Sequence, residues 1–274
     1  MLLEFAGVCA FRRAIDPALA ARCAEVASNV AGDVRALVCQ HGLDPDDPMN
    51  DFRFDGAYQR GPGRVDLRNH PALSAPPFTD DSLGTGALWL PLIERLLGHD
   101  AQLLWKGLVV TEPGTPEQPY HADGPLLSRD AWMLHSGKAC QSAALPAHSL
   151  TVFVPLVDYD GSGAEPTSFL PGSHRQDTAA ALKAEALEAG CSAGAGVPAP
   201  LEATAGDAIV FDLRTHHAGG GNASQKRRAV MYLVYAVPWY DGEVQRRLLE
   251  GQGVVEMGGG TPSKLKPLTA QMGG

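Results

Sequence analysis

The first apolar pattern along the chain is that of a long amphipathic helix. Asp16 followed by Pro17 is typical of a helix start, with Asp as the N-cap and Pro at the first helical position, and Gly42 is a natural stop. Between them the apolar positions keep the three-and-four spacing of one buried helix face, at Leu19, Cys23, Val26, Val30, Val34, Leu37 and Val38. One long helix, buried along that face, is therefore predicted.

The pattern changes twice after this helix. The stretch from Pro45 to Asp81 is rich in Asp, Arg, Gly and Pro, which predicts loops with short pieces of structure. A second helix is predicted from Leu88 to Leu97, closed by Gly98. From Gln102 onward short apolar runs alternate with turn residues, which is typical of a β-sandwich or barrel. The candidate strands are Leu103 to Thr111, Leu150 to Val157, Ala208 to Leu213 and Arg228 to Val237.

These elements predict a mainly β protein with flanking helices. Within the β region, Ala179 to Ala189 is expected to form a helix and Gly190 to Pro200 a loop of small residues. No break in composition marks a second domain, so residues 1–274 are expected to form one domain. We expect a helical part over about 1–100, a β core over about 101–240 and a C-terminal extension over 241–274.

Composition narrows the class of protein. Hydrophobic residues make up 45% and charged residues 19% of the 274 residues, which is typical of a globular protein. The net charge of −9 gives no overall electrostatic footprint for nucleic acid or anionic lipid. No apolar run is long enough to span a membrane. The five cysteines form no C-x-x-C pair, so a reducing, cytoplasmic location is expected. The sequence leaves both a monomer and a homodimer open.

Two clusters could carry metal chemistry. His121 and Asp123 are two residues apart after a predicted strand, so on an extended chain both side chains point to one side. A third ligand could come from His216 or His217, which precede three glycines, or from His174 after the turn Pro171-Gly172-Ser173. Two histidines and one carboxylate form the facial triad of non-haem iron(II) oxygenases.

A buried arginine is expected near these clusters. Arg228 opens an apolar strand, and a permanently charged guanidinium there needs a partner such as a bidentate carboxylate. Its neighbour Arg227 faces the opposite way along the strand, and a surface salt bridge is expected for it.

Together these residues resemble a known family. The motifs are Gln118-Pro119-Tyr120-His121-Ala122-Asp123, then Phe169-Leu170-Pro171-Gly172-Ser173-His174-Arg175, then His217 with its glycines and Asn222, then Arg228. In this order they resemble the phytanoyl-CoA dioxygenase family of Fe(II)- and 2-oxoglutarate-dependent oxygenases, over roughly Gln102 to Pro238.

The resemblance implies a fold, a site and a reaction. The implied core is a double-stranded β-helix, a jelly-roll or cupin-like fold. His121, Asp123 and His217 would hold Fe(II), and Arg228 would bind the distal carboxylate of 2-oxoglutarate, with Gln118 and Thr151 as further contacts to this cosubstrate. The implied reaction uses O₂, releases succinate and CO₂, and hydroxylates a small or medium organic molecule. Halogenating relatives lack the carboxylate ligand, so Asp123 favours hydroxylation.

The substrate side is not implied by the resemblance. Candidate pocket residues are Tyr120, Trp132 and Phe153, and the segment from Gly124 to His148 is expected to act as a lid. No basic cluster is evident in the sequence, which gives no support for a coenzyme A thioester as substrate. Two alternatives stay open, a cupin-like metal enzyme that does not use 2-oxoglutarate and a non-catalytic relative. In the first alternative, the cupin-like metal enzyme, Arg228 has no cosubstrate to bind.

Overall fold

The structure, a computed structural model, consists of two antiparallel sheets with helices on the outer face of the larger one. It describes residues 2–140, 145–159, 163–175 and 199–249. The larger sheet has the strand order β1-β9-β6-β11-β5-β4-β3-β2, and the smaller has the order β10-β7-β8. The strands of the larger sheet are β1 Val8–Phe11, β2 Arg53–Phe54, β3 Ala57–Gln59, β4 Arg64–Arg68, β5 Gln102–Thr111, β6 Ser149–Pro155, β9 Ala208–Asp212 and β11 Arg228–Ala236. Those of the smaller sheet are β7 Ser168–Phe169, β8 Ala199–Pro200 and β10 His217–Ala218.

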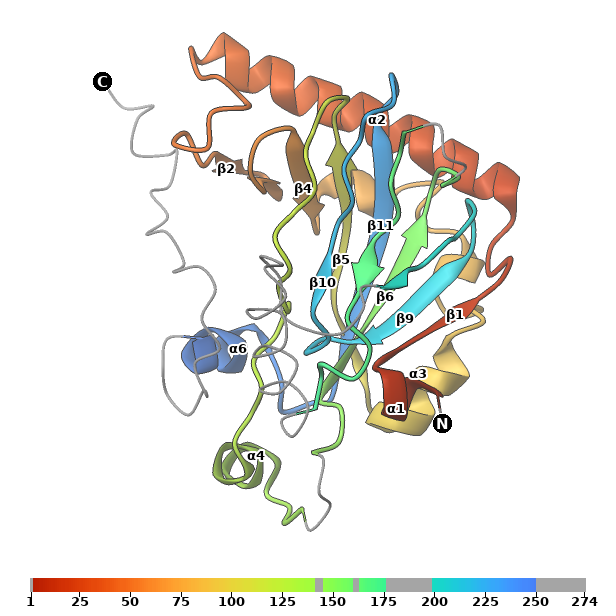
Figure 1. Cartoon of the computed structure of the whole chain (residues 1–274), viewed down its shortest axis with the longest axis vertical. Coiled ribbons are helices and arrows are strands. Elements are labelled where there is room, and N and C mark those ends of the chain that lie inside the picture. Colours follow the sequence, from red (N-terminus) through yellow and green to blue (C-terminus); the bar gives the residue numbers. More distant parts are fainter. Residues whose placement is uncertain (1, 141–144, 160–162, 176–198, 250–274) are drawn as a thin grey trace.

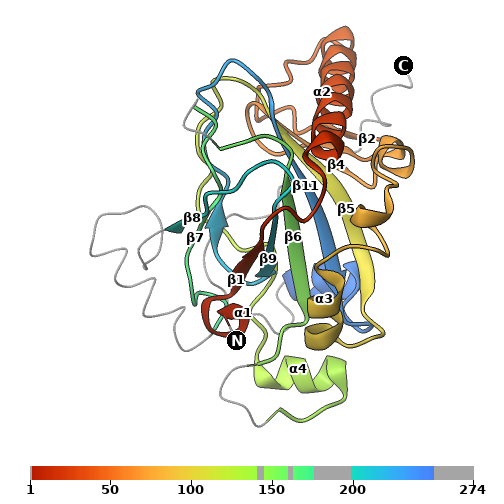
Figure 2. The same cartoon turned by 90° about the vertical axis from the view of Figure 1, so that its right-hand side faces the viewer.

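The described residues form the α-helices α1 Leu2–Ala6, α2 Pro17–Gln40, α3 Leu90–Leu97, α4 Arg129–Ser136 and α6 Gly242–Leu249. The predicted start of the long helix is confirmed, because the Asp16 side chain accepts a hydrogen bond from the Ala18 amide at the N-terminus of α2. The end of α3 at Gly98 is confirmed as well, with a φ of 103° at that glycine. In Figure 2, α2 and the small-sheet strands β7 and β8 lie on opposite sides of the large sheet. No helix among the described residues is long and apolar enough to cross a membrane.

The large sheet is buried on both faces, but the two faces differ in chemistry. On one face, apolar side chains of β4, β5, β6 and β11 pack against α2 and α3 in the main core, as Leu67, Leu108, Val152 and Met231 do. On the other face, alternate residues of the same strands line a cavity. Because successive side chains of a strand point to opposite faces, β11 contributes Ala229, Met231 and Leu233 to the core, and Arg228, Val230, Tyr232 and Val234 to the cavity.

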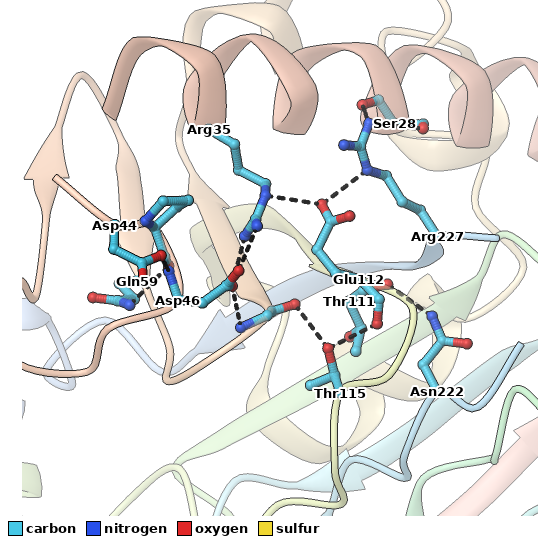
Figure 3. Close-up of polar contacts among 12 residues, drawn as sticks. Ser28, Arg35, Asp44, Asp46, Gln59, Thr111, Glu112, Thr115, Asn222 and Arg227 are labelled. Atoms are coloured by element: carbon cyan, nitrogen blue, oxygen red, sulfur yellow. Dashed lines mark hydrogen bonds and ion pairs between the residues drawn. The ribbon is translucent and has the colours of Figure 1, made fainter. Parts of the chain in front are cut away.

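A network of hydrogen bonds and ion pairs connects α2 to the end of β5 (Figure 3). Arg227 donates from Nε to Glu112 Oε1 at 2.8 Å and from Nη1 to the Ser28 carbonyl at 2.7 Å. Arg35 donates to both carboxylate oxygens of Asp46, at 2.9 and 2.7 Å. The ion pair expected for Arg227 is therefore present, on the face opposite to Arg228.

The predicted β core is confirmed, and its four main strands lie within one or two residues of their expected limits. Two antiparallel sheets in this arrangement form the double-stranded β-helix, or jelly-roll, type of fold. The first hundred residues, expected to be helical, also supply β1, β2, β3 and β4 to the large sheet (Figure 1). The helix expected over Ala179 to Ala189 lies outside the described residues, as does the extension beyond residue 249.

Candidate metal centre and cosubstrate pocket

Backbone pairing brings the two halves of the candidate metal site together. His121 and His217 form an isolated antiparallel bridge, with N–O distances of 2.9 and 2.8 Å between their amides and carbonyls. Asp123 Oδ1 lies 3.8 Å from His121 Nε2, and its Oδ2 lies 3.7 Å from His217 Nε2. One donor atom from each of the three residues falls within 4.8 Å of the others. The structure therefore gathers these three predicted ligands at one point.

The hydrogen bonds of the two imidazoles leave the right nitrogens for a metal. His121 Nδ1 lies 2.9 Å from the Pro119 carbonyl, and His217 Nδ1 lies 3.1 Å from the Thr215 carbonyl. A carbonyl only accepts, so in both rings Nδ1 carries the proton and Nε2 keeps its lone pair. Backbone bonds of this kind orient metal-binding histidines. Two neutral Nε2 atoms and one carboxylate facing each other fit a divalent transition metal such as Fe(II).

The charges at this site agree with that donor set. Burial lowers the pKa of His217 to about 4, although Asp123 opposes the shift. Burial also disfavours ionisation of Asp123, but electrostatic interactions with His217, His121, Arg60 and Arg68 outweigh it and hold the pKa of that carboxyl below its usual value. At neutral pH the site therefore offers a neutral imidazole beside a carboxylate.

The two other histidines considered as third ligand lie elsewhere. His174 is buried, its Nε2 lies 3.2 Å from the Glu4 carbonyl, and it borders a second cavity of about 370 Å³ beside Arg214. His216 uses its backbone amide to donate to Ser173 Oγ at 2.8 Å. Among the described residues, neither belongs to a group of side chains that could share a metal.

The triad opens into a cavity of about 430 Å³, within the range for small-molecule sites. Its wall includes Gln118, Thr151 and Arg228, the residues expected to contact the cosubstrate, and Phe153 from the expected substrate pocket. Tyr120 and Trp132 are not part of this wall. Trp132 is buried, with its ring in edge contact with the Trp239 ring, 5.2 Å between centroids.

Arg228 has the surroundings of an anion-binding residue. Only 3% of it is exposed, and it donates to the Glu165 carbonyl at 2.6 Å and to Thr111 Oγ1 at 3.3 Å. Its buried Nε has no hydrogen-bond partner among the described residues, and no carboxylate there forms an ion pair with it. Burial lowers its pKa. A buried, incompletely bonded guanidinium at the wall of a cavity fits a ligand carboxylate.

A second buried arginine lies near Arg228 and adds a second positive charge to this part of the protein. Arg64 is 4% exposed, and its Nη2 donates to the carbonyls of Pro116, Gly219 and Gly220. Burial and the neighbouring charge of Arg228 lower the pKa of Arg64 to about 10. Two like charges buried side by side are costly without an anion, which again fits a dicarboxylate such as 2-oxoglutarate.

The two further cosubstrate residues lie at different ends of the cavity. Gln118 adjoins Arg228, since a side chain at Gly219 would overlap Gln118 Oε1 and touch Arg228 Nη2. Thr151 pairs with Val234, six residues beyond Arg228 along β11, or about 20 Å at 3.3 Å per residue. Thr151 Oγ1 is buried and has no hydrogen-bond partner among the described residues. Its contact with the cosubstrate stays a prediction.

The structure adds cavity residues that sequence reasoning missed. Arg53, Arg60 and Arg68 come from β2, the β3–β4 turn and β4, and all three line the cavity with Asp66 and Tyr232. The expectation of no basic cluster is thus wrong for this site, because residues dispersed over the loop-rich stretch converge only when their strands pair. The alternation Arg64-x-Asp66-x-Arg68 was the available signal, since it predicts three polar side chains on one face of a strand.

The segment from Gly124 to His148, the expected lid, is partly packed and partly exposed: Met133 and Leu134 are 51% and 79% exposed. Leu127 and Trp132 belong to a cluster with Leu213 and Tyr240, and residues 141–144 lie outside the described residues. His148 is fully buried, with its ring stacked on Tyr240, 4.2 Å between centroids. Its role as a lid stays a prediction.

Comparison with known proteins agrees with this geometry. The family model described as "Phytanoyl-CoA dioxygenase (PhyH)" matches residues 3–230. The chain belongs to this family. A search of curated protein sequences gives no significant match.

Solved structures similar to this member of the phytanoyl-CoA dioxygenase family share its fold. The non-haem α-ketoglutarate-dependent carbocyclase SnoK of nogalamycin biosynthesis is 18% identical, with a TM-score of 0.53, covering 86% of this chain and 81% of that chain. EctD from S. alaskensis in its apo form is 18% identical, with a TM-score of 0.51, covering 86% and 75%. AviO1 from Streptomyces viridochromogenes Tue57 is 20% identical, with a TM-score of 0.51, covering 86% and 92%.

Proposed function

We propose that this protein is an Fe(II)- and 2-oxoglutarate-dependent oxygenase that hydroxylates a small organic substrate. The observation that carries the proposal is the convergence of His121, Asp123 and His217 in one cavity with the buried, incompletely bonded Arg228. Family membership supports it. Among proteins of this fold, EctD from S. alaskensis has been solved with bound Fe.

Each residue has a physical role in this proposal. Nε2 of His121, Nε2 of His217 and the Asp123 carboxylate would hold the iron and leave adjacent positions open. Arg228, with Arg64 behind it, would neutralise the distal carboxylate of 2-oxoglutarate and so orient its keto acid end toward the metal. The apolar side chains of Val230, Val234 and Phe153 limit water in the cavity.

Bound iron and 2-oxoglutarate supply the oxidising chemistry, in which 2-oxoglutarate becomes succinate and CO₂ and one oxygen atom of O₂ enters the substrate. Asp123 favours hydroxylation because its carboxylate fills the position that a halide would need. This assignment also distinguishes the site from a cupin-like metal centre without cosubstrate, which would give Arg228 and Arg64 no ligand carboxylate to bind.

The test is anaerobic titration of the metal-free protein, first with Fe(II) and then with 2-oxoglutarate, following the weak visible charge-transfer band of the chelate. The wild type is expected to show the band, and His217→Ala to lose it. Arg228→Gln is expected to need about 10- to 100-fold more 2-oxoglutarate, the effect of losing a charge-assisted hydrogen-bond pair.

Two variants serve as matched controls. Arg227→Gln removes the neighbouring guanidinium on the other face of β11, and His99→Ala removes an imidazole whose side chain is 91% exposed. Both are expected to keep the band at wild-type 2-oxoglutarate concentrations. Iron binding without the band in the wild type would refute the proposal and favour the cupin-like alternative.

A further inference from the structure

A cluster of three arginines lies beside the candidate metal centre and is not used by the proposed cosubstrate site. Arg53, Arg60 and Arg68 all line the main cavity. The only carboxylate paired with them among the described residues is Asp66, which is 1% exposed and binds Arg60 at 2.9 Å and Arg68 at 3.4 Å. The arginine cluster, defined as these three residues, therefore has two positive charges more than the carboxylate that forms ion pairs with it. The Asp123 carboxylate, which interacts electrostatically with Arg60 and Arg68, offsets part of this excess.

Two of these charges contact the same aromatic ring. The guanidinium of Arg53 lies 4.3 Å and that of Arg68 5.7 Å from the centre of the Tyr58 ring. Arg68 also lies over Trp105, at 5.0 Å. Cation–π contacts hold such side chains in place but do not cancel their mutual repulsion. Like charges held together at a cavity wall are typical of a site for an anion.

Arg68 is further held in place from β11. Tyr232 donates from its hydroxyl to Asp66 Oδ1 at 2.7 Å and accepts from Arg68 Nε at 3.2 Å. Nη2 of Arg68 also donates to Asp66 Oδ2 at 3.4 Å, whereas no hydrogen bond from Nη1 is found among the described residues. A guanidinium fixed in this way is suited to bidentate binding of an oxyanion.

The arginine cluster is separate from the position of Arg228. Arg68 pairs with Gly107, which pairs with Tyr232, so Arg68 lies two strands to the side of β11, or about 10 Å at the usual strand spacing. Arg228 lies four residues away along β11, or about 13 Å. The His217 ring contacts Phe153, the residue paired with Tyr232, so along β11 the candidate metal site lies at about the level of Arg68, on the β6 side of that strand. One small diacid cannot occupy both arginine sites and the metal.

We propose that the arginine cluster binds the carboxylate of the primary substrate, so that the enzyme oxidises an organic acid at a carbon held near the iron. The apolar cavity wall formed by Trp105, Val109 and Val230 would contact the hydrocarbon part of this acid. The inference rests on the proposed function, since it names the substrate class of that site. An anionic head and an apolar body match the two kinds of surface that the cavity presents.

The test compares acids with their neutral amides. Butyrate, hexanoate, octanoate and 3-phenylpropionate, each beside its amide, are titrated by ligand-observed NMR into the protein with Zn(II) and 2-oxoglutarate, and into the protein alone. In the wild type at least one acid is expected to bind tenfold or more tightly than its amide. Arg68→Gln is expected to weaken the binding of that acid about tenfold and to leave the binding of the amide unchanged.

Further variants and a further probe keep the result interpretable. Arg53→Gln removes the charge of an exposed residue that forms no ion pair with Asp66. It therefore tests the role of the charge even where Arg68→Gln affects folding. It is also expected to weaken the binding of the acid. Arg22→Gln, an exposed arginine on α2, is the matched control and is expected to change nothing. 2-Phenylethyl phosphate is the third probe, and tighter binding of this phosphate than of 3-phenylpropionate would overturn the carboxylate assignment.

Two other results would overturn the inference: no acid binding more tightly than its amide, or equal binding of the acid by wild type and both cluster variants. Loss of the Fe(II)–2-oxoglutarate band in the wild type would instead refute the proposed function. The titrations without metal or cosubstrate would still test the arginine cluster, so the two failures are distinguishable.

Discussion

Gly107 on β5 is the residue on which the position of Tyr232 depends. The Tyr232 ring lies across β5 to reach Asp66 on β4, and it does so over Gly107, which pairs with it in the sheet. A Cβ atom at position 107 would overlap Cζ and Oη of Tyr232. Because nonbonded carbons approach only to about 3.5 Å, the ring in a Gly107→Ala variant has to move by about 1 Å or more.

The loss in free energy of unfolding that we expect for Gly107→Ala has two contributions, both caused by the movement of the Tyr232 ring. Forcing a methyl group into this contact costs about 1–3 kcal/mol of the free energy of unfolding. Displacing the hydroxyl from the buried Asp66 carboxylate removes a charge-assisted hydrogen bond, which contributes about 1.5–3 kcal/mol. We therefore expect Gly107→Ala to lower the free energy of unfolding by about 3 kcal/mol.

A double-mutant cycle isolates the cause. In a Tyr232→Leu background the obstructing ring atoms are gone, so Gly107→Ala is expected to be neutral, or to stabilise the strand by about 0.5–1 kcal/mol through reduced backbone entropy. Urea unfolding followed by tryptophan fluorescence gives all four free energies, with equal m-values as the check on two-state comparison. If Gly107→Ala costs the same in both backgrounds within about 0.5 kcal/mol, the reasoning is wrong.

Three further predictions concern stability. Burial lowers the pKa of His148 to about 3, below its value of about 6.5 in the unfolded chain, so the unfolded state binds more protons and stability falls by about 2 kcal/mol from pH 7 to pH 5. Urea unfolding of His148→Gln should lack this share of the pH dependence, and an unchanged dependence would contradict it. Arg214→Met leaves the buried Asp212 carboxylate unpaired and should cost about 3–5 kcal/mol in the same assay, whereas Asp212→Asn/Arg214→Met should recover much of it. Asn222→Ala removes hydrogen bonds to the Thr111 and Lys226 carbonyls and should cost about 2 kcal/mol, and a loss below about 0.5 kcal/mol would show that it does not hold the turn before β11.

The candidate metal ligands and Arg228 were predictable because each lies in a local motif. His121 and Asp123 share a side of one extended segment, and His217 and Arg228 flank one glycine-rich turn. The choice of His217 over His216 and His174 needed the resemblance to the family. Its geometric reason, the backbone bridge between His121 and His217, appears only in the folded chain.

The arginine cluster was not predictable from the sequence, because its residues do not lie in one local motif. Arg53, Arg60 and Arg68 come from a stretch whose short strands carry no strong periodicity, and β2 has only two residues. Their meeting depends on the pairing of β4 with β5, a contact between segments about 40 residues apart. The separation of Thr151 from Arg228 is likewise a matter of strand register, which the hydrophobic pattern alone does not fix.

The sequence by itself determined the elements with strong periodicity, the antiparallel β core and the set of side chains able to bind a metal and a carboxylate. Local patterns suffice for these because the face of a helix or strand follows from the spacing of apolar residues. Only the tertiary structure decided that His217 pairs with His121 through the backbone, that Arg64 lies near Arg228, and that three dispersed arginines share a cavity with the candidate metal site. These are consequences of pairing between distant strands, which sets side chains from separate segments within a few ångströms of each other.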